Sequence, residues 1–458
     1  MLQLSEFVHK TQKDWISQAT SDLKGENPMD ALTWLSEEKM HWKPIYTSED
    51  VEKIPLESIR IAQKKKNNTS FYLLESVYVV DTNGETIKQA NQKALDLLAK
   101  GATSLVFDIH SLTLDTLQIQ RLLLGIKTSE TPIFWNTEQA ILIYQNQKKS
   151  SPHHLKGGIL EPIVQFTSEA TWESNHKKIS QLLLQTQQDK NFKVIWASSV
   201  PFVNAGANAV QELSYFCNQW VELLEKCLEA GHTVQEIIDK TFFEIGLTTN
   251  YFLDIAKIRA FRYLLHKLIT AFEPTCNLGN SQLSGRLATY YLSPFSSHTN
   301  MLRATTATMS GLIGGLDTVS IPAWDTVEKP NQESELARRV ALNTFHVVQE
   351  EGLLTATQDP SEGSYFLENL TYELIQQSWD LFLENEKKGG FWDLFKSGEV
   401  QTSIADMHEY RVTQKNKVMV GVNKYMDTKE EANIKLSKKL TFLDERSLAV
   451  SLKENVHS

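Results

Sequence analysis

The sequence predicts an α/β fold: a closed (β/α)8 barrel of the TIM type, with an extended N-terminal arm and a short helical C-terminal extension. Eight short apolar runs, rich in β-branched and aromatic residues, recur about every 30 to 50 residues and are typical of buried strands. Amphipathic helical stretches lie between most of these runs. A repeated alternation of strand and helix implies parallel pairing, and eight such units suit a closed barrel.

The predicted elements follow one another through the middle of the chain. The eight strands are expected at residues 71–80, 103–109, 132–135, 159–166, 192–198, 241–245, around 277–281, and at 316–321. Three long helices are expected at residues 86–100, 209–230 and 251–272. A doubly wound open sheet is the competing fold, but its first strand normally leads into a glycine-rich turn. Only Gly84 follows the first predicted strand here, which favours the barrel.

The ends of the chain differ from its middle. Residues 1–55 hold short amphipathic pieces interrupted by Gly25, Pro28 and Pro44, and we interpret them as an arm for partner docking. Residues 56–400 are expected to form the barrel. Residues 401–458 are polar and helical without further strand signals, which indicates a C-terminal helical extension.

Composition excludes several classes of function. The 458 residues carry a net charge of -10, and an acidic surface repels a phosphate backbone, so no nucleic-acid partner is expected. The three cysteines have no metal-ligand spacing, which predicts buried thiols in a reducing cytosol and no metal site. No apolar run approaches the roughly 20 residues of a membrane span, and no signal peptide is visible. A cytoplasmic protein without a membrane partner is therefore expected.

Two polar motifs could carry chemistry. Asp108-Ile109-His110 follows a strong strand, but a cobalamin lower-ligand motif needs glycine three residues after the histidine, where Thr113 stands. Ser281 to Arg286 come at and just after the predicted seventh strand, where barrels often hold phosphate groups. Hydroxyls and an arginine suit a pyrophosphate, although a solvent-facing polar loop would look the same.

A third charged group is predicted to be structural. Asp254, Lys257, Arg259 and Arg262 lie along one predicted helix, and the first two form an ordinary pair three residues apart. Without visible partners elsewhere in the sequence, they predict a solvated outer face of that helix.

Five segments together resemble one enzyme family. They are Lys43-Pro44-Ile45-Tyr46-Thr47 with Asp50; Phe242 to Gly246 continuing through Asp254 to Arg262; Ser281-Gln282-Leu283-Ser284-Gly285; Asp359-Pro360 with Gly363-Ser364-Tyr365 and Glu368; and Gly421-Val422-Asn423-Lys424-Tyr425. Taken together, the segments are similar to adenosylcobalamin-dependent acyl-CoA mutases of the methylmalonyl-CoA mutase type, over nearly the whole chain. The resemblance implies a (β/α)8 barrel whose axis takes the CoA chain, followed by a separate cobalamin-binding domain.

The sequence departs from the catalytic pattern of that family. The family's catalytic histidine lies in a Gly-Tyr-His-Met-Gln-Glu-Ala-Gly run, and the matching run at residues 199–206 has Pro201 in its place. The family's Arg-Gln-Tyr-Ala-Gly-Phe turn has no counterpart near residues 71–80, and residues 315–322 replace its histidine-bearing segment after the eighth strand. The sequence ends at Ser458, and we expect no cobalamin domain in this chain.

These departures imply a subunit without catalytic residues. The resemblance leaves Ser281, Gln282 and Ser284 as vestigial substrate-binding residues and assigns no cofactor to this chain. Adenosylcobalamin is then expected in a catalytic large subunit that acts as the partner. Two alternatives stay open: the catalytic substrate-binding chain of a split mutase, or a free-standing CoA-thioester binding protein in which Arg286 anchors a phosphate.

Overall fold

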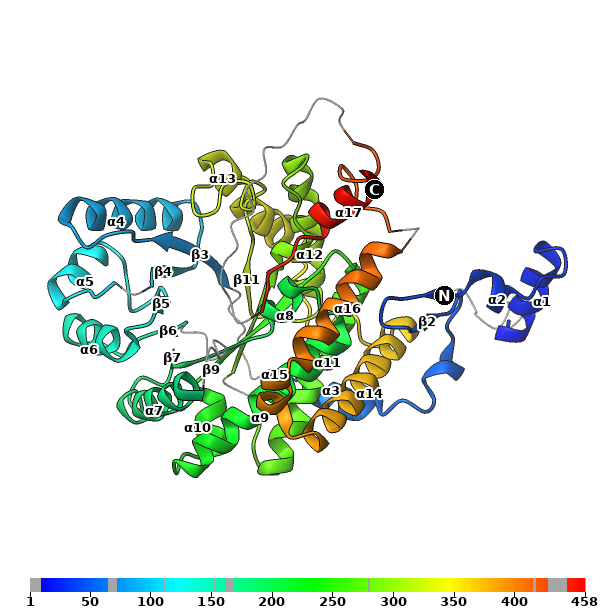
Figure 1. Cartoon of the computed structure of the whole chain (residues 1–458), viewed down its shortest axis with the longest axis horizontal. Coiled ribbons are helices and arrows are strands. Elements are labelled where there is room, and N and C mark those ends of the chain that lie inside the picture. The colour runs from blue at the N-terminus through cyan, green and yellow to red at the C-terminus, as the bar shows by residue number, and fades with distance from the viewer. Residues whose placement is uncertain are drawn as a thin grey trace, which may run out of the picture.

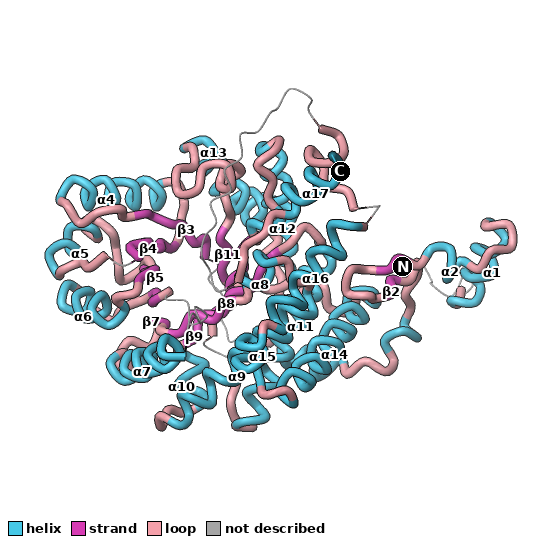
Figure 2. Tube along the Cα trace, viewed as in Figure 1, coloured by secondary structure: helices cyan, strands magenta, loops and turns pink. Residues whose placement is uncertain are grey.

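The computed structural model describes residues 10–64, 72–110, 112–151, 153–160, 169–278, 281–414, 417–426 and 443–457. Its centre is a ring of parallel strands enclosed by helices (Figures 1 and 2). The strands are β3 (Tyr72–Tyr78), β4 (Ser104–His110), β5 (Ile133–Thr137), β6 (Gly157–Ile159), β7 (Phe192–Lys193), β8 (Ile195–Ser198), β9 (Thr241–Leu247), β10 (Gln282–Leu287) and β11 (Thr318–Ser320).

The ring closes through one interrupted strand. Hydrogen-bonded neighbours follow the order β7-β6-β5-β4-β3-β11-β10-β9-β8, and all these pairs are parallel. A single residue, Val194, separates β7 from β8, and its amide donates to the Lys240 carbonyl at 2.9 Å. The two short strands thus occupy one strand position in the ring, and the predicted barrel of eight strands is confirmed.

Helices cover the outside of the ring. Those between or beside the strands are α3 (Leu56–Gln63), α4 (Gly84–Ala99), α5 (Thr116–Leu122), α6 (Ala140–Ser150), α7 (Glu169–Gln185), α8 (Val200–Ala205), α9 (Ala209–Glu229), α10 (Val234–Asp239), α11 (Tyr251–Phe272), α12 (Asn300–Ile313) and α13 (Glu335–His346). The three predicted long helices correspond to α4, α9 and α11. After the barrel come α14 (Tyr365–Lys387), α15 (Gly390–Ser397), α16 (Glu399–Thr413) and α17 (Leu448–His457).

Two predicted strands were misplaced. The strand expected at residues 159–166 is β6, which ends at Ile159, and residues 161–168 lie outside the described part of the chain. The strand expected around 277–281 is β10, which begins at Gln282. Its alternate residues Gln282, Ser284 and Arg286 are polar, so the apolar run that marks the other strands is absent. The barrel interior near β10 is therefore polar rather than apolar.

An apolar layer nevertheless fills part of the barrel axis. Leu74, Val106, Phe134, Leu160 and Phe242 form one buried cluster, against which Trp196 packs. The rings of Phe134 and Phe242 lie 5.1 Å apart, although their strands are separated by several others. Side chains from different strands thus meet across the interior, as in the packed core of other (β/α)8 barrels.

The charged residues of α11 are buried, so the prediction of a solvated face was wrong. Asp254, Lys257 and Arg259 have no exposed surface, and Arg262 is only 7% exposed. Helix α14 packs on α11 from outside the barrel, and α9 packs beside it. The C-terminal helices thus add a second layer over this side, and Lys257, Arg259 and Arg262 each meet a carboxylate distant in sequence.

The N-terminal segment projects from the body. Its elements are α1 (Gln12–Asp22), α2 (Pro28–Leu32), β1 (Trp34–Leu35) and β2 (His41–Trp42), and Figure 1 shows α1 and α2 standing clear of the barrel. No residue of α1 is buried, and Trp15 and Ile16 stay partly exposed. The other predicted arm anchors, Leu4, Phe7 and Val8, lie outside the described residues. Across the part of the chain that the structure describes, none of the helices is long and apolar enough to cross a membrane.

Candidate functional site at the C-terminal mouth of the barrel

Pro201, which the sequence resemblance sets in the place of a histidine, lies at the mouth of the barrel. Helix α8 begins directly after β8, and Pro201 stands in its first turn. Proline suits this position because the first amides of a helix need no intrahelical acceptor. The helix ends at Gly206, whose φ of 108° is the left-handed conformation that favours glycine. Barrel enzymes carry their catalytic groups at this end of the strands, but the Pro201 ring has no donor or acceptor to offer.

An ion pair occupies the mouth beside Pro201. Arg286 donates to Glu244 Oε1 from Nη2 at 2.6 Å and from Nε at 3.1 Å. The Ser198 hydroxyl donates to the other oxygen of Glu244 at 2.7 Å. The Arg286 guanidinium also lies 5.9 Å from the centre of the Trp196 ring. Although burial lowers the pKa of Arg286, the Glu244 carboxylate more than offsets it and raises that pKa. Arg286 is thus neither a loop residue nor a free cation waiting for a phosphate.

The three proposed substrate-binding residues lie below this ion pair. Ser281 precedes β10, and its hydroxyl donates to the Leu278 carbonyl at 2.7 Å. Gln282 and Ser284 lie within β10, opposite Phe242 and Glu244 of β9. Side chains two residues apart share one face of a strand, so Gln282, Ser284 and Arg286 all face the interior. They therefore line the barrel wall, not a loop beyond the strand as the sequence predicted.

Two hydroxyls on this wall have no partner among the described residues. Ser284 is fully buried and Thr318 of β11 is 2% exposed, and neither side-chain oxygen makes a hydrogen bond there. The two residues are directly opposite in the parallel register of β10 and β11. Buried hydroxyls normally find partners, so these two are the unsatisfied polar groups of this part of the wall.

Asp108 and His110 form a second polar pair at the mouth. His110 Nε2 lies 3.1 Å from Asp108 Oδ1, and the Asn136 amide donates to Asp108 Oδ2 at 3.0 Å. His110 has a φ of 43°, a strained value for a non-glycine residue, and its ring is 68% exposed. The sequence did not predict this pairing, although the two-residue spacing on a strand was a signal for it. Because Thr113 stands where the cobalamin lower-ligand motif needs glycine, the pair departs from that motif.

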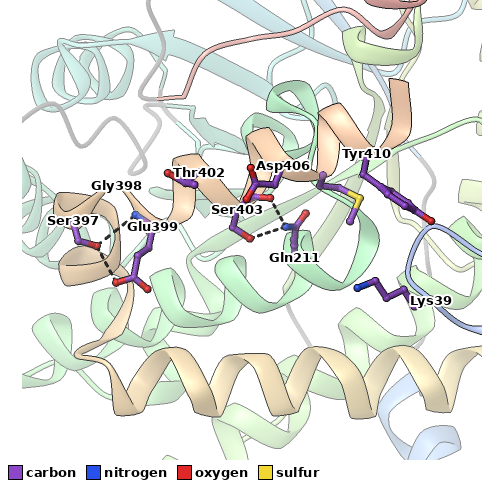
Figure 3. A pocket seen from close by; sticks show the side chains of 10 residues that line it. Lys39, Gln211, Ser397, Gly398, Glu399, Thr402, Ser403, Asp406 and Tyr410 are labelled. Atoms are coloured by element: carbon purple, nitrogen blue, oxygen red, sulfur yellow. Dashed lines mark hydrogen bonds between the residues drawn. The ribbon is translucent and has the colours of Figure 1, made fainter. Parts of the chain in front are cut away.

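Chemistry beyond these pairs is limited. Among the described residues, no three histidine, cysteine or acidic side chains gather in a way that could hold a metal. A groove of about 600 Å³ runs along α16, away from the barrel strands (Figure 3). Figure 3 shows Thr402, Asp406 and Tyr410 following one another along that helix, with Lys39 of the hairpin turn beside the groove. Gln211 of α9 also lines the groove, and its side-chain amide donates to the Ser403 hydroxyl at 2.9 Å. The lining offers hydrogen bonds but no catalytic arrangement.

Comparison of the sequence with known protein families identifies a match over most of the chain. The family described as methylmalonyl-CoA mutase matches residues 86–451. The chain belongs to the methylmalonyl-CoA mutase family.

Individual members of the methylmalonyl-CoA mutase family are similar along most of the chain. The methylmalonyl-CoA mutase small subunit of Porphyromonas gingivalis is 28% identical over 94% of this chain and 72% of that protein. The methylmalonyl-CoA mutase of Cereibacter sphaeroides is 26% identical, over 91% of this chain and 64% of that protein. The mitochondrial enzyme of Homo sapiens is 25% identical, over 92% of this chain and 61% of that protein. This mutase-family chain thus spans less than two thirds of the latter two relatives.

Similarity to solved structures adds little. A dihydropteroate synthase from Yersinia pestis aligns with a TM-score of 0.34 at 12% identity, covering 63% of this chain and 96% of that chain. A score at that level carries no argument about function.

Two of the segments that resemble the methylmalonyl-CoA mutase family meet in the structure as a clamp. Arg259 of α11 donates to Asp359 at 3.2 Å and to Glu368 at 3.0 Å. The Gly363 amide donates to the same oxygen of Glu368 at 3.0 Å, and Ser364 caps the start of α14. The clamp holds α14 against the barrel, so Arg259, Asp359 and Glu368 maintain the fold.

Proposed function

We propose that this chain is the non-catalytic small subunit of a heterodimeric, adenosylcobalamin-dependent methylmalonyl-CoA mutase, which interconverts methylmalonyl-CoA and succinyl-CoA in the cytoplasm. The observation that carries the proposal is Pro201, which follows the C-terminal end of β8 at the position where the resembling enzymes have their histidine. The rearrangement needs a polar group to hold the thioester carbonyl, and proline supplies none. A chain that keeps the fold and lacks this group suits an architectural role.

The interior of the barrel supports the same proposal. The resembling enzymes pass the CoA chain along the barrel axis, and here the buried layer around Phe134 and Phe242 lies across it. An acyl-CoA on that path would also have to displace Arg286 from Glu244. Glu244 is buried while the Arg286 side chain is 39% exposed, so separating the pair would leave a buried carboxylate without its hydrogen-bonded counter-charge, which opposes entry of a substrate.

We assign adenosylcobalamin to the partner rather than to this chain. When bound, the cofactor supplies the radical that starts the rearrangement. His110 follows Asp108 by two residues at the mouth. It departs from the cobalamin lower-ligand motif because Thr113 stands where that motif needs glycine. The name of the Porphyromonas gingivalis relative, a small subunit, supports the existence of a larger partner chain.

Purified alone, the chain is expected to show no mutase activity, even with adenosylcobalamin and a separately supplied cobalamin-binding domain. The Pro201→His variant should stay inactive as well, because the interior layer and the Arg286–Glu244 pair remain in place. Formation of succinyl-CoA from methylmalonyl-CoA is the measurement, with the complex of this chain and the large subunit as positive control. Turnover above background by the isolated chain would instead favour the catalytic chain of a split mutase.

A free-standing CoA-thioester binding protein is the second candidate. The unpartnered hydroxyls of Ser284 and Thr318 favour it, together with Ser281 and Gln282 near the same wall. Calorimetric titration of the isolated chain with CoA distinguishes the two proposals. Saturable binding that weakens in the Ser284→Ala variant would favour the second candidate, whereas no heat of binding is expected for a purely architectural subunit.

A further inference from the structure

A chain of aromatic rings lies where the N-terminal arm joins the body. We define the aromatic ledge as Trp34, Trp42, Tyr46, Phe252 and Phe366. The rings of Trp34 and Trp42 are 4.7 Å apart, and Phe366 lies 5.3 Å from Trp42, 5.3 Å from Tyr46 and 5.7 Å from Phe252. The ledge thus connects the β1–β2 hairpin with the first turns of α11 and α14.

The outer members of the ledge face solvent. Trp34 is 53% exposed and Phe252 is 48% exposed, and Leu32 at the end of α2, Leu35 of β1 and Tyr365 of α14 are 48%, 49% and 43% exposed. Strand β1 pairs with β2 on one side, and no described strand pairs with its other edge. Grouped apolar side chains beside an open strand edge are typical of protein–protein contact sites, where tryptophan and tyrosine often dominate the binding energy.

Ion pairs fasten the hairpin of the ledge to the rest of the chain. At the hairpin turn, Glu37 accepts a hydrogen bond from Arg411 Nε at 2.6 Å and pairs with Lys417. At the hairpin base, Lys43 pairs with Asp50 at 2.7 Å. Partner binding therefore needs little ordering of these side chains, which favours affinity for a given contact area.

The projecting arm adjoins the ledge. Helix α1 buries none of its residues on its own chain, and Figure 1 shows α1 and α2 extending outward from the hairpin that carries Trp34. A protein seated on the ledge would therefore lie within reach of the arm. The two surfaces are continuous, so one partner can contact both.

We propose that the aromatic ledge is the body-side docking surface for the catalytic large subunit, with Trp34 and Phe252 as its main anchors. The inference rests on the proposed function. The large subunit is chosen over a second copy because the small-subunit relative points to a larger partner, and because the ledge is continuous with the arm proposed to hold that partner.

The test compares matched substitutions in the full-length chain. Trp34→Ser and Phe252→Ser remove ledge anchors, whereas Leu117→Ser and Leu124→Ser remove side chains of similar exposure, 54% and 70%, on or just after the distant helix α5. Each variant is titrated against the purified large subunit of the same organism, after circular dichroism confirms folding. Each ledge substitution is expected to weaken the Kd at least about tenfold, and each control less than about threefold.

The outcomes separate the two proposals. A wild-type chain that binds the large subunit while the ledge variants bind equally well would overturn the ledge and leave the proposed function standing. A wild-type chain that does not bind the large subunit at all would overturn the proposed function itself. A wild-type homodimer that the ledge substitutions dissociate, seen by light scattering, would make a second copy the occupant and overturn the choice of partner.

Discussion

The Lys257→Met variant is expected to lose about 3–5 kcal/mol of its free energy of unfolding. Lys257 is fully buried, and its ammonium group lies 2.7 Å from Glu212 and 3.3 Å from Asp254. It also donates to the Gly246 carbonyl at 2.5 Å. Removing this cation leaves two carboxylates buried without their counter-charge, which is the costly way to break a buried ion pair.

The rest of the network cannot compensate for that loss. Glu212 accepts from the Ser199 hydroxyl at 2.6 Å and the Gly246 amide at 2.9 Å, and Asp254 accepts from the Thr248 amide at 2.7 Å. These bonds satisfy oxygens but supply no positive charge. Burial raises the pKa of both carboxyl groups even with Lys257 present, and it should raise them further without it.

The pH dependence of the Lys257→Met variant gives a second readout. A carboxyl group whose pKa is higher in the folded than in the unfolded state binds protons more readily when folded, so its folded state gains stability as the pH falls. The deficit of the variant should therefore narrow between about pH 8 and pH 5. Chemical denaturation across this range is the measurement.

The control for the loss of stability is Lys100→Met, which removes an exposed partner 2.6 Å from Asp96 and should cost about 0.5 kcal/mol or less. A loss below about 1 kcal/mol for Lys257→Met would contradict the role of Lys257 as the counter-charge of Glu212 and Asp254.

The barrel was predictable because most of its strands repeat one pattern. Strands such as β4 and β9 are nearly continuous apolar runs, buried on both faces, and their boundaries were predicted to within a few residues. Strand β10 was misplaced because Gln282, Ser284 and Arg286 give it a polar inner face, which from sequence looks like a loop. The location of Pro201 followed from the resemblance, and the structure shows it beside the mouth.

The partners of the polar residues were not predictable. Arg286 meets Glu244 because β9 and β10 are neighbours in the ring, and Arg259 meets Glu368 across 109 positions of sequence. Only the folded topology brings such residues together. Spacing within one helix therefore suggested a solvated face for α11, whereas all four charges are buried, Arg259 by contact with α14 and the others by contacts with the barrel and α9. Local spacing pointed to two contacts, the Asp254–Lys257 pair three residues apart and the Asp108–His110 pair two residues apart.

Deleting residues 1–25 is expected to weaken or abolish co-purification with the catalytic large subunit while leaving the barrel folded. The deletion removes α1, which buries none of its residues on its own chain, so the body loses little packing. We infer a permanent heterodimer, and such interfaces commonly bury about 2,000 Å² or more. Trp15 and Ile16, both partly exposed in α1, would each contribute roughly 1.5–3 kcal/mol on burial against the partner.

Point substitutions sharpen the test of the arm. Trp15→Ser and Ile16→Ser combined should weaken the Kd at least about tenfold, while Gln18→Ser on the exposed side of α1 should change it little. Gel filtration of the co-expressed subunits measures the complex, and circular dichroism of the truncated chain measures the fold. A truncated chain that still elutes as a tight stoichiometric complex would show that the arm does not hold the two subunits together. The ledge alone would then have to hold the two subunits together, which its own variants test independently.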